Sequence, residues 1–129
     1  MKYFRNPPDV CAPIASYSHQ AELIGAQRVL VMSGQIGQKR DGTVPADPLE
    51  QLQITLENIQ HNLRHAGMDI RDIVKLTTYI VGELDITRRR QIMTTWLAGH
   101  RPCMTMLFVA GLAVPELKVE IEAMASRDG

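Results

Sequence analysis

Two carboxylates near the end of the chain are the first candidates for chemistry. Glu120 and Glu122 stand two apart in residues 117–124, where apolar residues alternate with polar or long ones. Side chains of a strand point to opposite faces in turn, so both acids share one face of a predicted strand. Such a pair marks either an exposed sheet face or the floor of a pocket, in which one carboxylate activates water as a general base. The spacing alone leaves both interpretations open.

Two other possible nucleophilic centres have weaker support. Tyr17, Ser18 and His19 follow one another, but no aspartate lies nearby in the sequence to orient the histidine, which argues against a Ser/His triad. Cys103 follows Pro102 at the start of a predicted strand that has no cation close to it. A small buried hydrophobe is therefore favoured over a reactive thiol.

A possible metal pair lies on a predicted helix. His61 and His65 are four residues apart and Glu57 precedes them by another four, which resembles a helical metal site. Their phase places them opposite the apolar stripe of that helix, so a solvated surface is favoured. We expect no metal site.

Residues 88–90 are three consecutive arginines in a second predicted helix. The run as a whole is typical of a solvated helix face, but helical phase separates its members. Arg88 falls outside the apolar side, whereas Arg89 and Arg90 fall on or beside it. An arginine on a packing face needs a carboxylate, a carbonyl or a ligand.

The elements that must position these residues are predicted from periodicity and from helix and turn signals. Asp47, Pro48 and Glu50 read as an N-cap, a first helical residue and a capping box, and Gly67 reads as a C-terminal stop. Helices are expected at 48–66 and 86–98, and strands at 2–5, 20–24, 28–32, 74–81, 104–109 and 117–124, with 20–24 and 28–32 joined as a hairpin at Gly25.

This order predicts an α+β domain with a mixed sheet and both helices on one face. No element is left to cover the other face, on which Tyr79, Val81 and Met124 would lie. A partner subunit is the simplest source of cover.

Bulk properties narrow the classes of protein. The 129 residues suit one domain, 1–129. The net charge of zero argues against electrostatic attraction to nucleic acid or to an anionic membrane. The first residues have no apolar core like that of a signal peptide, and no apolar run is long enough to span a bilayer. Two cysteines do not make a disulfide framework, so reduced thiols in a cytoplasmic protein are expected.

Taken together, the motifs resemble the RidA/YjgF family over nearly the whole chain. The most specific are SGQIG at 33–37, LENI at 56–59 and VEIEAMA at 119–125, in this order. The resemblance implies a chorismate-mutase-like fold, a homotrimer with ligand clefts between subunits, and hydrolysis of reactive enamines or imines to ketoacids and ammonia. It also implies that a bound water attacks the imine carbon and that no metal or organic cofactor is needed.

The resemblance assigns roles to particular residues. Glu120 matches the acid that positions the water, and Tyr17 matches a tyrosine that lines the cleft. Ser33, Gly34 and Gln35 match the wall of the cleft after the second strand.

One position departs from the family pattern. A Pro-x-Arg-Thr motif normally supplies an arginine for the substrate carboxylate, but here it reads Pro102-Cys103-Met104-Thr105. Cys103, Met104 and Thr105 are still expected at the substrate, yet a thioether cannot replace a charged fork. The chain thus resembles a divergent branch of the family, also marked by the YSH sequence at 17–19. Arg90 is the hypothetical replacement cation, because it aligns with a position that lines the cleft in many members.

Three functions remain open on the sequence. The first is a cofactor-free deaminase-type hydrolase that acts on a small imine, enamine or related nitrogenous metabolite. The second is a ligand-binding or regulatory trimer that has lost catalysis, which Met104 favours. The third is RNA cleavage or translation inhibition, against which the zero net charge argues.

Overall fold

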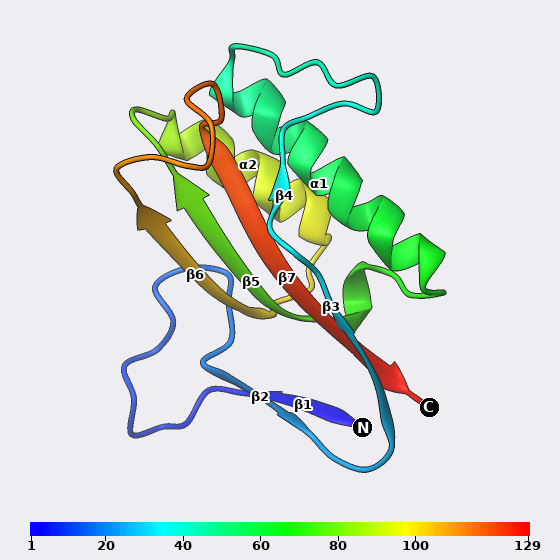
Figure 1. Cartoon of the computed structure of the whole chain (residues 1–129). Helices are drawn as coiled ribbons and strands as arrows, with labels where there is room; N and C mark the ends of the chain where they lie inside the picture. Colours follow the sequence, from blue (N-terminus) through cyan, green and yellow to red (C-terminus); the bar gives the residue numbers. More distant parts are fainter.

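The computed structural model describes residues 1–129 and contains one main sheet (Figure 1). Its strands run in the order β3 (Gln27–Val31), β7 (Val119–Asp128), β5 (Ile73–Ile80) and β6 (Cys103–Phe108), and β4 (Gln35–Ile36) pairs with β7 beyond β3. The β5–β6 pair is parallel and the other pairs are antiparallel, so the sheet is mixed. β1 (Lys2–Arg5) and β2 (Gln20–Leu23) form a separate two-stranded ribbon.

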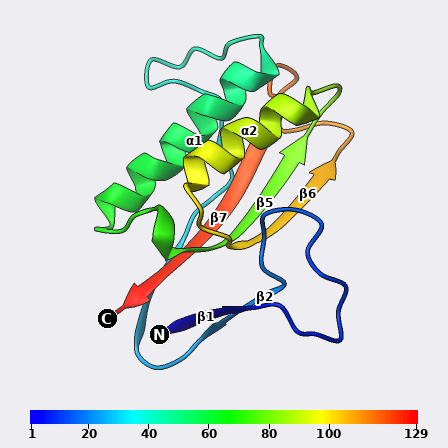
Figure 2. The same cartoon turned by 180° about the vertical axis from the view of Figure 1, so that it is seen from behind.

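Both helices cover one face of this sheet. α1 (Pro48–His65) and α2 (Ile86–Leu97) lie behind the strands in Figure 1 and in front of them in Figure 2. A short 3-10 turn, Ile70–Asp72, leads into β5. The predicted α+β architecture is confirmed. Neither helix is both long enough and apolar enough to cross a membrane.

The core lies between the helices and the sheet. The apolar stripe of α1 packs on alternate residues of β7, and both sets are almost wholly buried: Leu52, Leu56, Ile59 and Leu63 from the helix, and Val119, Ile121, Ala123 and Ala125 from the strand. The predicted faces of both elements are therefore correct. Burial of a leucine or isoleucine side chain contributes about 1.5–3 kcal/mol each, which makes this interface the main support of the fold.

The ends of α1 follow the sequence signals with one difference. The Asp47 carboxylate accepts the Leu49 backbone N–H at 3.0 Å, and Gly67 takes a left-handed φ of 71° after the last turn. Asp47 is the N-cap, as predicted, but it accepts from Leu49 and not from Glu50, and Glu50 makes no bond back to the cap, so the predicted capping box is not formed. Exposed carboxylates at a first helical turn still interact favourably with the helix dipole.

The predicted hairpin between residues 20–24 and 28–32 was wrong. β2 pairs with β1 instead, in a register that joins Lys2 to Leu23, and β3 pairs with the end of β7, with Leu30 opposite Ala125. β7 continues to Asp128, beyond the predicted end of the strand, and this extension supplies the ladder partner that β3 uses. The polar residues 126–128 carry no apolar alternation, which hid the extension.

A buried glutamine links α1 to the segment that enters β7. The Gln51 side chain has no exposed surface, and its Nε2 donates to the carbonyl oxygens of Pro45 at 2.8 Å and Glu116 at 2.9 Å. Its Oε1 accepts the Lys118 backbone N–H at 2.8 Å. Gly37 packs directly against it, because a Cβ there would lie 2.6 Å from the Gln51 Cα. This contact sets where β7 begins relative to α1.

The sheet face away from the helices is uncovered. It carries Val29, Val31 and Leu107 among polar neighbours, and Val31 is 75% exposed. Val29 and Val31 lie together on β3, whereas Leu107 lies on β6 at the other end of the strand order. Exposed apolar patches mark interaction surfaces in soluble proteins.

Candidate active site

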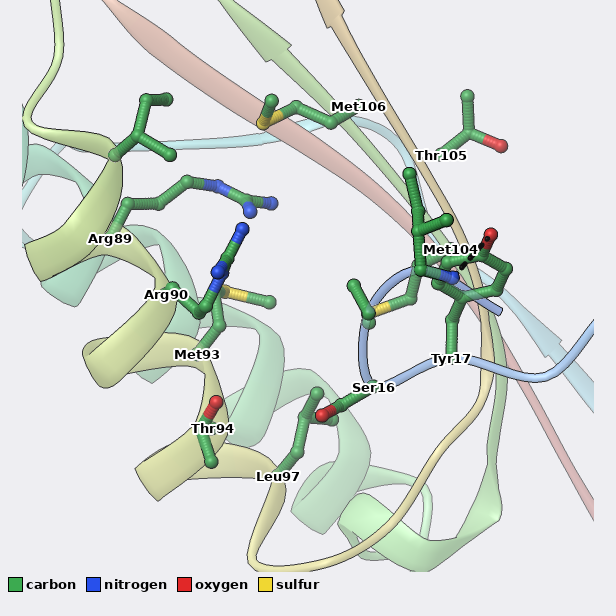
Figure 3. Close-up of a pocket in the computed structure, with 13 residues that line it drawn as sticks. Ser16, Tyr17, Arg89, Arg90, Met93, Thr94, Leu97, Met104, Thr105 and Met106 are labelled. Carbon is green, nitrogen blue, oxygen red and sulfur yellow. Dashed lines mark hydrogen bonds between the residues drawn. The ribbon is translucent and has the colours of Figure 1, made fainter. Parts of the chain in front are cut away.

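A cavity of about 480 Å³ opens between α2, β6 and the loop that precedes β2 (Figure 3). Pockets of this size suit small-molecule ligands. Its lining consists of Ile14, Ala15, Ser16 and Tyr17 from the loop, Ile86, Arg89, Arg90, Met93, Thr94 and Leu97 from α2, and Met104, Thr105 and Met106 from β6.

The loop wall of the cavity is held in place by Ser18. Its backbone N–H donates to the Pro102 carbonyl at 3.1 Å, and its hydroxyl donates to the Arg101 carbonyl at 2.6 Å. Ser18 is itself buried. These two bonds fasten the loop to the chain immediately before β6, which brings Tyr17 beside Met104 (Figure 3). Tyr17, Met104 and Thr105 therefore all line one cavity.

Two arginines enter the same cavity from α2. Arg89 and Arg90 both extend from the helix toward β6, and their guanidinium groups lie on the same side of the helix (Figure 3). Neither forms an ion pair with a carboxylate. Arg89 is half-buried, and its Nε is buried without a hydrogen-bond partner. Burial lowers the pKa of Arg89, and the positive charge of Arg90 lowers it further, although arginine remains a cation throughout the working range of proteins.

Alternation along β6 separates the residues that were predicted at its start. Met104 packs toward the helix-side core, next to the cavity. Cys103, a free thiol, lies outside the cavity lining, and burial raises its pKa while the charge of Lys75 opposes that shift. Lys75 also donates through Nζ to the Thr105 hydroxyl at 2.8 Å.

Glu120 stands on the uncovered face of the sheet, because its neighbours Val119 and Ile121 point into the core. It lies opposite Ile36 of β4 and Tyr79 of β5. The carboxylate occupies the space that a side chain at position 34 would need, since a Cβ on Gly34 would lie 2.1 Å from Oε2. Gly34 therefore forms a seat for the Glu120 carboxylate.

The second acid of the strand has a different contact. The Tyr79 hydroxyl donates to Glu122 Oε1 at 2.5 Å. This hydrogen bond, with some burial and the charges of Glu122 and Glu120, raises the pKa of Tyr79. Glu122 is thus satisfied by a neighbour within the sheet, whereas Glu120 makes no hydrogen bond to a side chain of its own chain.

Ser33 and Gln35, which follow β3, have different surroundings. Ser33 is exposed beside the Gly34 seat. Gln35 turns toward α1, where its Oε1 accepts from Asn62 at 3.1 Å, and its Nε2 donates to the Ser33 carbonyl at 3.0 Å. Gln35 therefore braces the turn against the helix.

Within one chain the predicted site residues form two separate groups. Glu120, Ser33 and Gly34 lie around β7 and β4, whereas the cavity lies at the far edge strand, β6, on the helix side, with β5 between. Arg89 was not selected as a site residue from the sequence, although its helical phase had already placed it on or beside the apolar side of α2.

Comparisons with known proteins agree with this fold. The sequence model of the family described as Endoribonuclease L-PSP matches residues 8–127. The 2-iminobutanoate/2-iminopropanoate deaminase of Rattus norvegicus is 33% identical over 116 residues, which are 88% of this chain and 82% of that protein.

Solved structures extend the similarity to three dimensions. The Rid family protein YyfB of Yersinia pestis has a TM-score of 0.82 at 30% identity, covering 96% of this chain and 97% of that one. The Escherichia coli protein TdcF, solved with bound serine, has a TM-score of 0.70 at 30% identity, covering 96% and 94%. These neighbours have the chorismate-mutase-like fold that the motifs implied. The chain belongs to the Endoribonuclease L-PSP family, the RidA/YjgF family that its motifs resemble.

Proposed function

We propose that this chain is a cofactor-independent, deaminase-type hydrolase of small enamines or imines that works as a homotrimer with its ligand cleft between subunits. The observation that carries the proposal is the position of Glu120: a carboxylate seated against Gly34 on an uncovered sheet face. The rat relative named 2-iminobutanoate/2-iminopropanoate deaminase supports the reaction type.

The predicted site residues form two groups that lie apart within one chain, and this separation supports a cleft shared between two subunits. Glu120 and Met104 lie on opposite sides of one sheet, so no ligand can touch both within a single chain. A second copy covering the face that exposes Val31 would bury that apolar surface and could bring its own cavity edge toward Glu120. The cleft would then combine Glu120, Ser33 and Gly34 with the cavity wall, whereas the Gln35 side chain, which was also expected there, turns toward α1.

The proposed chemistry needs only water and one base. Glu120 holds a water molecule and removes its proton as the oxygen attacks the imine carbon. The proton returns to nitrogen and gives a carbinolamine. Glu120 then carries the hydroxyl proton to the amine as the C–N bond breaks, so that a ketone and ammonia leave. Tyr17 orients the ligand, and Arg90 provides the cation that is missing at position 104, where Met104 is uncharged.

Ammonia release from freshly generated 2-iminoacids tests this proposal. We expect a rate above the buffer reaction from a sample whose trimeric mass is checked by light scattering. If the trimer binds small carboxylates and releases no ammonia above buffer, the non-catalytic ligand-binding function is correct instead.

The Gly34→Ala variant should separate the position of Glu120 from the stability of the fold. The added methyl group would collide with the Glu120 carboxylate, which can move aside because it is the end of a flexible side chain. We expect at least a roughly 10-fold loss of imine hydrolysis, since a displacement of about 1 Å can cost 100-fold in rate. Steady-state kinetics and thermal unfolding measure the two effects.

Gly111→Ala is the matched control for that variant. A Cβ at Gly111 meets nothing within 4 Å, so activity and stability should both stay near the wild type. Unchanged activity in Gly34→Ala would contradict the role given to the Gly34 seat.

A further inference from the structure

The cavity beside α2 has an unbalanced positive charge. Arg89 and Arg90 both line it, and none of its 13 lining residues is an aspartate or glutamate. Two arginines elsewhere in the chain form ion pairs, Arg5 with Glu22 at 3.0 Å and Arg127 with Asp72 at 3.1 Å. The cavity therefore concentrates two cations where no acid of the same chain reaches them.

Because Arg89 is half-buried, its charge is unfavourable unless an anionic hydrogen-bond acceptor binds to it. Its Nε is buried with no hydrogen-bond acceptor, and a buried unsatisfied donor costs about 1–3 kcal/mol, more when it is charged. The neighbouring charge of Arg90 adds repulsion. An acceptor with negative charge would remove both penalties, because guanidinium forks bind carboxylate and phosphate oxygens through paired hydrogen bonds.

A ligand needs more than one negative charge to neutralise both guanidinium groups. A single carboxylate can be bound by one fork through two parallel bonds, which leaves the other arginine unpaired. Because the groups leave α2 from consecutive positions and enter the same space (Figure 3), one dianion can contact both. Most of the remaining wall is apolar, with Ile86, Met93 and Leu97 facing Met104 and Met106, and Ser16, Thr94 and Thr105 are its other polar residues.

We propose that this cavity binds a small dianionic ligand with an apolar body, held by Arg89 and Arg90 together. This rests on the proposed function in that the ligand would be the substrate or a close analogue of it. The substrate would then carry an anionic group beyond the one carboxylate of a simple 2-iminoacid. Its anionic groups would contact Arg89 and Arg90, and its carbon chain would lie against the methionines of β6.

Titration calorimetry with matched ligands tests the charge requirement. Adipate and hexanoate have carbon chains of the same length but differ by one carboxylate, and pentyl phosphate tests whether a phosphate serves equally well. We expect adipate, pentyl phosphate or both to bind at least about 10-fold more tightly than hexanoate, since charged hydrogen bonds contribute about 1.5–3 kcal/mol. The preference should weaken at high salt, because added ions screen the exposed Arg90.

Variants identify the residues responsible. Arg89→Gln and Arg90→Gln should each reduce the preference for dianions to about twofold or less, an expectation for the loss of one charged fork. Arg88→Gln should keep the preference, because Arg88 is exposed and outside the cavity. Arg89→Lys retains the charge without the fork and serves if Arg89→Gln does not fold.

Two outcomes would overturn the proposal. One is equal affinity of the wild type for adipate, pentyl phosphate and hexanoate. The other is dissociation of the trimer in Arg89→Gln with dianion binding unchanged, which would make the arginines interface residues. Ammonia release is measured on the same samples: hydrolysis without dianion preference contradicts only this inference, whereas dianion preference without hydrolysis contradicts only the proposed reaction.

Discussion

Glu120→Gln is expected to lower the rate of imine hydrolysis by about 100-fold or more, the usual contribution of a positioned general base. Glutamine has nearly the same shape as glutamate and can occupy the same seat against Gly34. It cannot accept the proton of the attacking water, so binding should survive while turnover is lost. The kcat for ammonia release should therefore fall much more than KM changes.

Glu122→Gln is the matched control for the loss of one carboxylate on the same strand face. Glu122 accepts the Tyr79 hydroxyl, a bond that the amide oxygen of glutamine can also accept. We expect its hydrolysis rate to remain within about twofold of the wild type, since Glu122 is given no role in proton transfer. The role of Glu120 would be refuted if the two variants lost activity equally, or if Glu120→Gln retained most of its rate.

Gln51→Leu should produce the largest loss of stability among the substitutions considered, about 3 kcal/mol or more in the free energy of unfolding. Leucine fits the volume but leaves the Pro45 and Glu116 carbonyls and the Lys118 N–H without the partner that Gln51 provides. Each buried polar group left unpaired costs about 1–3 kcal/mol. Because residues 116–118 lead into β7, a shift there should also displace Glu120.

Gln53→Leu makes the same change on the exposed side of α1 and serves as the control. Exposed substitutions usually stay within about 0.5 kcal/mol of the wild type. Urea denaturation at one fixed protein concentration measures both variants, since the stability of an oligomer depends on concentration. A loss below about 1 kcal/mol in Gln51→Leu would show that water or relaxed neighbours replace its three bonds.

Much of the fold was predictable because local signals and tertiary packing agree. The stripe of α1 and the alternation of β7 already identified the faces that meet in the core, from Leu52 and Ile59 on one side to Val119 and Ile121 on the other. Asp47 and Gly67 marked the ends of α1 through contacts that span only a few residues. Such short-range features can be read in sequence because the residues that cause them are neighbours.

Strand pairing was less accessible to sequence reasoning. Residues 20–24 and 28–32 are adjacent in the chain and suggested a hairpin, but β3 pairs with β7 about a hundred residues away. The polar residues at the end of β7 contain no local pattern that predicts this pairing. Non-local pairings depend on which edges the packed core leaves available, and this is a property of the whole chain.

The candidate site also has some features that follow from local sequence and others that follow from tertiary packing. The sequence by itself identified Glu120 as the candidate acid and suggested Met104 as a departure from the family pattern. It also supplied the helical phase that places Arg89 and Arg90 on or beside the apolar side of α2. Only the tertiary structure decided that Gly34 seats the acid, that both arginines enter one cavity with Met104, and that Glu120 lies on the other side of the sheet. The face of a helix or strand on which a side chain lies is a local property of the backbone. The residues that surround that side chain depend on how elements distant in the sequence pack against one another.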